Sequence, residues 1–255
     1  MRLSLPIVLV VTSTLVLAGC GDSGSPEEGA TSSAAPTTAA PSEPPDPSAE
    51  PSAEPGVTPE PTEQTTEPPA SPVTDLPASV LLPAESLFPE GEIRTEGEGV
   101  VDWVFPVPCA VGGPGAAVAM RSVAQGDGTF EVPVGHHQVA VFEDVDAAVA
   151  EADRIAAALD ACQGTGSDGQ SSSIVEPVAV GAQGIGFVVD YYGALQANGD
   201  EGTLGYYTAV TRRGNAVTLV SSEGGESSIA ASRERVVGEL GAAWDQLCAY
   251  ESTGC

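Results

Sequence analysis

Residues 203–221, TLGYYTAVTRRGNAVTLVS, form one of the most regular stretches of this 255-residue chain. Two runs rich in β-branched and aromatic residues, Thr203–Thr211 and Ala216–Ser221, flank the tripeptide Arg213-Gly214-Asn215. Such runs, separated by a short turn that contains glycine, are typical of β-hairpins. The stretch therefore predicts two antiparallel strands joined by a tight turn.

Similar patterns on both sides of this hairpin predict further strands and three helices. Strands are expected at Ala116–Val123, within Val132–Phe142, at Ile174–Val180 and at Ile185–Tyr192. Helices are expected at Ala78–Phe88, from Asp144 through Cys162, and from Ser227 or Ser228 to about Tyr250. Strands joined by hairpins, with helices packed over them, predict an α+β fold with a mainly antiparallel sheet flanked by helices.

Helical periodicity supports the two long helices. In the first, apolar side chains recur every three or four residues and share one face: Val145, Val149, Ala152, Ile155, Leu159 and Cys162. Asp144, immediately before this pattern, is a typical N-cap. In the second helix, Trp244 and Cys248 lie one turn apart on the expected inward side.

The N-terminus predicts a lipid anchor. Arg2 is followed by a largely apolar run, Leu3–Leu17, and then by Ala18-Gly19-Cys20. A positive residue, an apolar run and small residues in this order indicate a signal peptide, here residues 1–19. Leu17-Ala18-Gly19-Cys20 resembles the bacterial lipobox, so Cys20 is expected to carry a diacylglycerol and hold the protein at the outer face of the cell membrane. An ordinary secretory peptide cut elsewhere and an uncleaved membrane helix are the alternatives.

Residues 20–78 are expected to be a tether. Proline, glutamate, serine, threonine and alanine dominate this segment, which contains no aromatic residue and no arginine. Such a composition cannot bury enough apolar surface to offset the loss of chain entropy, so we expect disorder. A tether of this length reaches roughly 40 to 180 Å.

The remaining residues, 79–255, are enough for one domain. They carry 25 acidic side chains and 7 arginines, and the chain contains no lysine. This negative charge disfavours nucleic acid and anionic lipid headgroups as partners. The preference for Arg, Ala, Gly and Val suggests a genome of high G+C content, which together with the lipobox indicates an actinobacterial source.

Four cysteines lie beyond Cys20, and in an exported domain an even number implies two disulfides. Three connectivities are open, and we favour Cys109–Cys162 and Cys248–Cys255. The first bond closes a loop whose chain-entropy contribution is about 4 kcal/mol. The spacing of the cysteines is not that of zinc ligands, so we expect no metal.

Catalytic motifs are missing from the sequence. His136 and His137 are adjacent, so on a strand they point to opposite faces, and we interpret them as a solvated strand segment. Without lysine there is no P-loop, and no Gly-x-Ser-x-Gly elbow occurs. We therefore expect a protein that is not an enzyme, with no catalytic residue and no cofactor.

Several short motifs are spread over residues 79–255: Leu81-Leu82-Pro83, Pro108-Cys109, Phe142 before an alanine-rich helix ending in Cys162, and Trp244-x-x-x-Cys248. Together they resemble the PknH-like extracellular sensor domain of mycobacterial Ser/Thr kinases, which also occurs alone in actinobacterial lipoproteins. The resemblance implies an antiparallel sheet flanked by helices, two disulfides and a ligand-binding cleft. This chain departs from the pattern in having no kinase segment and in placing its last cysteine at the C-terminal residue.

Two functions remain for such a protein. The first is a tethered module that binds or senses a small extracytoplasmic ligand or an envelope protein. The alternative is a cell-wall-acting enzyme whose site uses carboxylates and tyrosines without a recognisable motif. A purified domain that converted wall fragments into new products would favour the enzyme.

Strand alternation suggests where a ligand would bind. Asp190 and Tyr192 share one face of their strand, and Tyr207 lies on the more polar face of the next strand. Arg121 is the single cation on the strand Ala116–Val123. We hypothesise that these four residues line a cleft. The alternative is that helices cover both faces of the sheet and these residues fill a second packing layer.

Overall fold

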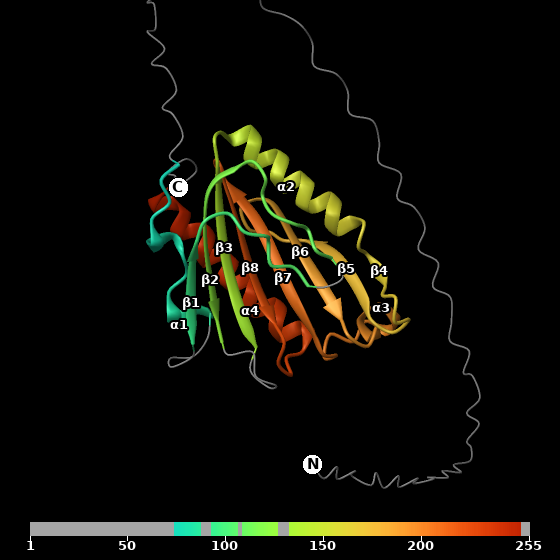
Figure 1. The fold of residues 1–255 in the computed structure, drawn as a ribbon. Helices are drawn as coiled ribbons and strands as arrows, with labels where there is room; N and C mark the ends of the chain where they lie inside the picture. Colours follow the sequence, from blue (N-terminus) through green and yellow to red (C-terminus); the bar gives the residue numbers. More distant parts are fainter. Residues whose placement is uncertain (1–73, 88–92, 107–108, 127–132, 251–255) are drawn as a thin grey trace, which may run out of the picture. The chain divides into compact units, whose positions relative to one another are not determined.

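The computed structural model describes residues 74–87, 93–106, 109–126 and 133–250. They contain one eight-stranded antiparallel sheet in the order β1-β2-β3-β8-β7-β6-β5-β4 (Figure 1). The strands are β1 Arg94–Glu98, β2 Ala117–Gln125, β3 Val134–Phe142, β4 Gly164–Thr165, β5 Ser172–Pro177, β6 Ala182–Asp190, β7 Gly205–Arg213 and β8 Ala216–Glu223. The predicted α+β fold with an antiparallel sheet is confirmed.

Helices cover both faces of this sheet (Figure 1). The helical elements are η1 Ala78–Val80, α1 Ala84–Leu87, α2 Val145–Asp160, α3 Ala194–Asn198, α4 Ile229–Gln246 and η2 Leu247–Ala249. Helix α2 packs on one face, where Ile155 and Leu159 join a buried cluster with Phe187. Helix α4 packs on the other face, where Leu240 joins a second cluster that includes Tyr207. The sheet is therefore the middle layer of three.

The hairpin β7–β8 lies at the centre of the sheet. Its turn contains Gly214 at φ 53°, a left-handed conformation that glycine adopts without steric cost. Because both faces are covered, nearly every residue of β7 and β8 is buried. Side chains of β7 pack alternately into the two buried clusters, with Tyr206 on the α2 side and Tyr207 on the α4 side.

Side-chain caps fix the starts of both long helices. Asp144 accepts a hydrogen bond from the backbone N–H of Ala147 at 2.8 Å, as the sequence predicts. Ser228 plays the same role for α4 and accepts from the N–H of Ala231 at 3.3 Å. The expected inward face of α2 is confirmed at Ile155 and Leu159, whereas Val145 is 44% exposed because it lies in the first turn, at the rim of the sheet.

The sequence did not predict β1, β4 or α3. Strand β1, with the sequence RTEGE, is almost wholly exposed at the edge of the sheet and has no apolar alternation. Strand β4 has two residues and helix α3 has five, which is too short for a periodic pattern. Such elements are held by neighbouring chain segments and leave little trace in local sequence.

The interpretation of the histidine pair as a solvated segment is wrong for His137. Its ring is fully buried on β3, accepts from the backbone N–H of Leu82 at 2.9 Å, and lies 2.9 Å from Oγ1 of Thr218. Burial, followed by the charge of Arg94, lowers the pKa of His137 to about 3. Burial also lowers the pKa of His136 to about 4. His137 is a neutral core residue that ties the N-terminal segment to the sheet.

The structure contradicts one of the two predicted disulfides and does not test the other. Cys109 and Cys162 lie next to each other, with Sγ of Cys109 4.0 Å from the carbonyl oxygen of Cys162, but both are free thiols. Burial, followed by the adjoining Cys162 thiol, raises the pKa of Cys109 to about 12. The predicted Cys109–Cys162 disulfide is therefore not formed in the structure. Cys255 lies outside the described residues, so the Cys248–Cys255 bond stays a prediction.

The predicted anchor at Cys20 and nearly all of the tether also lie outside the described residues. Within the described part of the chain, no helix has the length and apolar character needed to span a bilayer.

Candidate functional site

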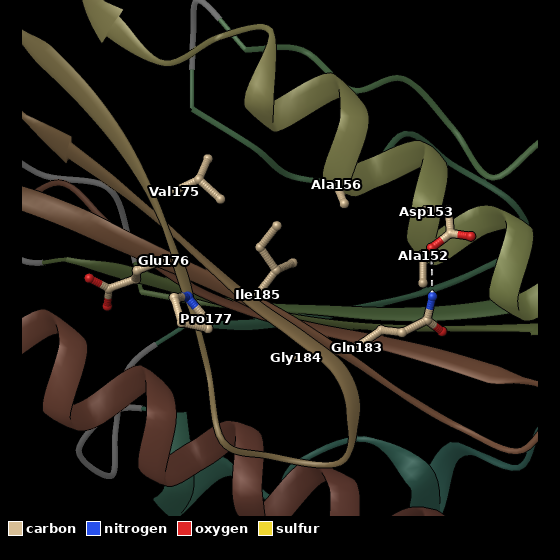
Figure 2. Close-up of a pocket in the computed structure, with 9 residues that line it drawn as sticks. All are labelled: Ala152, Asp153, Ala156, Val175, Glu176, Pro177, Gln183, Gly184 and Ile185. Carbon is tan, nitrogen blue, oxygen red and sulfur yellow. Dashed lines mark hydrogen bonds between the residues drawn. The ribbon is translucent and has the colours of Figure 1, made fainter.

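A groove lies between helix α2 and the β5–β6 hairpin, on the α2 side of the sheet (Figure 2). Its volume is about 310 Å³, near the lower end of the range for small-molecule sites. The lining residues are Ala152, Asp153, Ala156, Val175, Glu176, Pro177, Gln183, Gly184 and Ile185. The groove is thus built from one helix and two neighbouring strands.

Small side chains on α2 leave the groove open. Ala152 and Ala156 are one helical turn apart and face the sheet, where Val175 and Ile185 point up toward them (Figure 2). Larger residues at the two alanine positions would close this space. Val175 and Ile185 remain partly exposed at the edge of the α2-side cluster. The floor and one wall are therefore apolar, and the alanines set the width.

The polar end of the groove is formed by Asp153 and Gln183. The side-chain amide of Gln183 donates to Oδ1 of Asp153 at 2.7 Å, and its carbonyl oxygen accepts from Nε of Arg212 at 2.7 Å. This arrangement holds the amide in one orientation and leaves the second oxygen of Asp153 for another partner. The polar end thus presents a carboxylate beside an apolar floor.

The backbone at this end is strained. Gln183 has φ 55°, and it is the single non-glycine residue with positive φ in the described ranges. It lies where the register between β6 and β7 shifts, between Ala182 and Ile185, which is a β-bulge. Strained non-glycine residues and bulges are both enriched at binding sites. The bulge aims Gln183 at helix α2.

The second carboxylate among the lining residues, that of Glu176, does not point into the groove. Figure 2 shows the Glu176 side chain directed away from α2. Its carboxylate lies on the α4 side, where it accepts from Nε of Arg233 at 2.8 Å and from the hydroxyl of Tyr207 at 2.7 Å. Burial raises the pKa of Tyr207 well above its usual value. The charge available inside the groove is therefore that of Asp153.

The lining of the groove offers few chemically reactive groups. None of the nine lining residues carries a hydroxyl, thiol, amine or imidazole, and Asp153 keeps one carboxylate oxygen without a hydrogen-bond partner among the described residues. No group of three potential metal ligands occurs within the described ranges.

The structure does not bring together the four residues of the hypothesised cleft. Tyr207 is fully buried beneath α4, as in the alternative in which helices cover both faces. Asp190 is also fully buried and accepts from the backbone N–H groups of Tyr192 and Leu195 at 2.9 and 2.7 Å, which ties β6 to α3. The side chain of Tyr192 is 56% exposed. Arg121 lies on β2, which β3 and β8 separate from β7, and it pairs with Glu98 at 3.2 Å.

Sequence reasoning missed the groove. The helical pattern places Ala152 on the buried face of the helix, and Gln183-Gly184 lies outside the predicted strands. The signal in the sequence is the pair of alanines four residues apart on the inward side of an otherwise larger apolar face. That signal indicates a gap, but it does not say which strands lie opposite.

No model of a known protein family matches the chain, and no curated protein matches it. Among solved structures, the chain is similar to one described as the crystal structure of the extracellular domain of PknH from Mycobacterium tuberculosis. The two share 15% sequence identity with a TM-score of 0.41, and the match covers 66% of this chain and 94% of that chain. The comparison records a distant structural similarity and assigns the chain to no sequence family.

Proposed function

We propose that residues 79–255 form an extracytoplasmic module that binds a small ligand in the α2 groove and is held at the membrane by a lipid on Cys20. The signal peptide and lipobox of the sequence support export and anchoring. The observation that carries the binding role is the groove itself, an apolar space of about 310 Å³ with one oriented carboxylate at its end.

The ligand chemistry follows from this lining. An apolar ring or short chain would cover Val175 and Ile185 and displace water from them. A cationic nitrogen or a hydrogen-bond donor on that ligand would meet the second oxygen of Asp153. The predicted ligand is therefore a small amphipathic amine or a similar donor, and a carboxylate of the same shape is disfavoured.

A pair of matched probes tests this proposal. Cyclohexylamine and cyclohexanecarboxylate have the same ring and opposite charges at neutral pH. A ligand with a dissociation constant of about 1 mM, present at about 20 mM, stabilises the folded state by about 2 kcal/mol, or roughly 4 to 8 °C in Tm. We expect this shift with the amine and a much smaller one with the carboxylate.

Equal shifts from both probes, or none from either, would contradict the proposed ligand class. Incubation of the same preparation with cell-wall fragments tests the enzymatic alternative, and formation of new products would replace the binding role with a catalytic one.

A further inference from the structure

Two neighbouring arginines at the end of β7, Arg212 and Arg213, form no salt bridge with a described carboxylate, whereas four other arginines of the domain do. Arg94, Arg121, Arg154 and Arg233 each lie within 3.2 Å of a glutamate oxygen. Arg212 and Arg213 contact only neutral groups within the described part of the chain. Arg212 donates to Gln183 and to the carbonyl of Gly214 at 2.7 and 2.9 Å. Arg213 donates to the carbonyl of Trp244 at 3.0 Å.

The position of Arg213 is energetically costly. The residue is 3% exposed, and its Nε and Nη2 are buried without a hydrogen-bond partner among the residues that the structure describes. A buried guanidinium that lacks partners pays an uncompensated desolvation penalty. Stacking on the indole of Trp244, with Cζ 3.7 Å from the ring centroid, recovers a part of it. The carbonyl of Trp244, in the last turn of α4, accepts a hydrogen bond from Nη1 but from neither of the other two guanidinium nitrogens.

Both arginines line a second cavity, of about 440 Å³, with Gly181, Ala182, Gly214 and Trp244. It lies where β6 begins and β7 ends, so side chains from both faces of the sheet reach it. Nη2 of Arg212 has no hydrogen-bond partner among the described residues. The cavity therefore combines one free donor, two guanidinium charges without a carboxylate partner in the described structure, and the edge of an aromatic ring.

We propose that this cavity is an oxyanion site for a small ligand that carries a phosphate or carboxylate group, separate from the α2 groove. A protein with a net charge of −28 repels anions in general, so a local pair of unneutralised arginines is needed to hold one. Guanidinium groups match the paired oxygens of phosphate and carboxylate. Arg212 makes the direct contact, and Arg213, whose free nitrogens are buried, supplies charge at short range.

Titrations followed by ¹H–¹⁵N NMR test this proposal in the intact domain. The probes are inorganic phosphate and sodium acetate, each compared with sodium chloride at matched ionic strength. We expect a saturable shift of the Trp244 indole N–H and of the Gly181 and Gly214 amides with at least one oxyanion. A response to only one of the two oxyanions identifies the group that the site takes. Shifts that chloride reproduces, or no saturable shift with either oxyanion, would overturn the proposal.

Three variants locate the site. Arg212→Gln and Arg213→Met should each weaken oxyanion binding at least tenfold, whereas Arg121→Gln, which removes the same charge from β2, should change it less than twofold. An apolar replacement of a buried unpaired charge is often neutral or stabilising, so we expect Arg213→Met to fold with an unchanged or higher Tm. If Arg213→Met does not fold, the loss of oxyanion binding in Arg212→Gln tests the site instead. If Arg121→Gln and Arg212→Gln weaken oxyanion binding equally, the binding depends on the overall charge of the protein and the proposed site is refuted.

The same variants separate this site from the α2 groove. Arg212 also bonds Gln183 at the end of the groove, but Arg213 does not. Binding of cyclohexylamine should therefore be unchanged in Arg213→Met. A parallel loss of both ligands in that variant would show that the two cavities are not independent, and it would contradict a separate oxyanion site.

Discussion

The side-chain amide of Gln183 donates to Asp153 across 2.7 Å and joins the β6 bulge to helix α2. Gln183 makes this contact from a left-handed backbone conformation, φ 55°, that is unfavourable for a residue with a Cβ atom. The bond therefore links a strained strand position to the carboxylate at the end of the groove. The strain is a measurable property of the folded protein.

The strain predicts different effects for two substitutions of Gln183. Gln183→Gly and Gln183→Ala both lose the bond to Asp153, but only glycine relieves the backbone. We expect the glycine variant to be more stable than the alanine variant by about 1 kcal/mol in urea denaturation. Equal stabilities would mean that residue 183 is not held at positive φ in solution.

Burial predicts opposite outcomes for two tyrosines. Tyr207 is fully buried and its hydroxyl bonds Glu176, so Tyr207→Ala should cost about 3 to 5 kcal/mol of unfolding free energy. Tyr192 is 56% exposed, and Tyr192→Ala should cost less than about 1 kcal/mol. Denaturation midpoints of the two variants check this. A mild effect at Tyr207 would contradict its place beneath α4.

The buried histidine predicts a loss of stability in mild acid. Burial lowers the pKa of His137 to about 3, below the value near 6.5 of the unfolded chain. Between these values the unfolded chain binds a proton that the folded protein does not, so the unfolding free energy decreases as the pH falls from about 6.5 toward 3. From pH 7 to pH 5, His137 accounts for a loss of about 2 kcal/mol.

His137→Asn removes this titration and keeps an acceptor for the N–H of Leu82. The variant should therefore lose about 2 kcal/mol less than the wild type between pH 7 and pH 5, in denaturation curves recorded at both pH values. Identical pH dependence in the two proteins would show that His137 does not titrate with unfolding.

The lipid anchor predicts a change of location. Because the thioether bond to the lipid needs sulfur, Cys20→Ser should move the protein from the membrane fraction to the medium or leave unprocessed precursor. Fractionation and mass spectrometry of the mature N-terminus measure this. A Cys20→Ser protein that stays in the membrane at its mature size would contradict lipid attachment at this residue.

The sequence predicted the main helices and strands better than the site. Periodicity located α2 and α4, and the cap Asp144 was recognisable because capping depends on residues next to each other in the chain. The faces of the strands were also predictable, but what covers each face was not. The polar residues that share a strand face with Tyr207 favour an open cleft, whereas α4, which begins beyond β8, buries this tyrosine. The groove depends on contacts between α2 and the bulge at Gln183, and a bulge is a register shift that strand alternation does not reveal.

An NMR titration with cyclohexylamine tests the central claim, that the α2 groove binds a small ligand. The account predicts saturable shifts of the backbone amides of Ala152, Ala156 and Ile185, which line the groove. Ala156→Leu fills the groove and should abolish these shifts, whereas Ala157→Leu, on the exposed side of the same helix, should preserve them. Saturable shifts that lie elsewhere, or that survive in Ala156→Leu as they do in Ala157→Leu, would contradict the groove as the binding site.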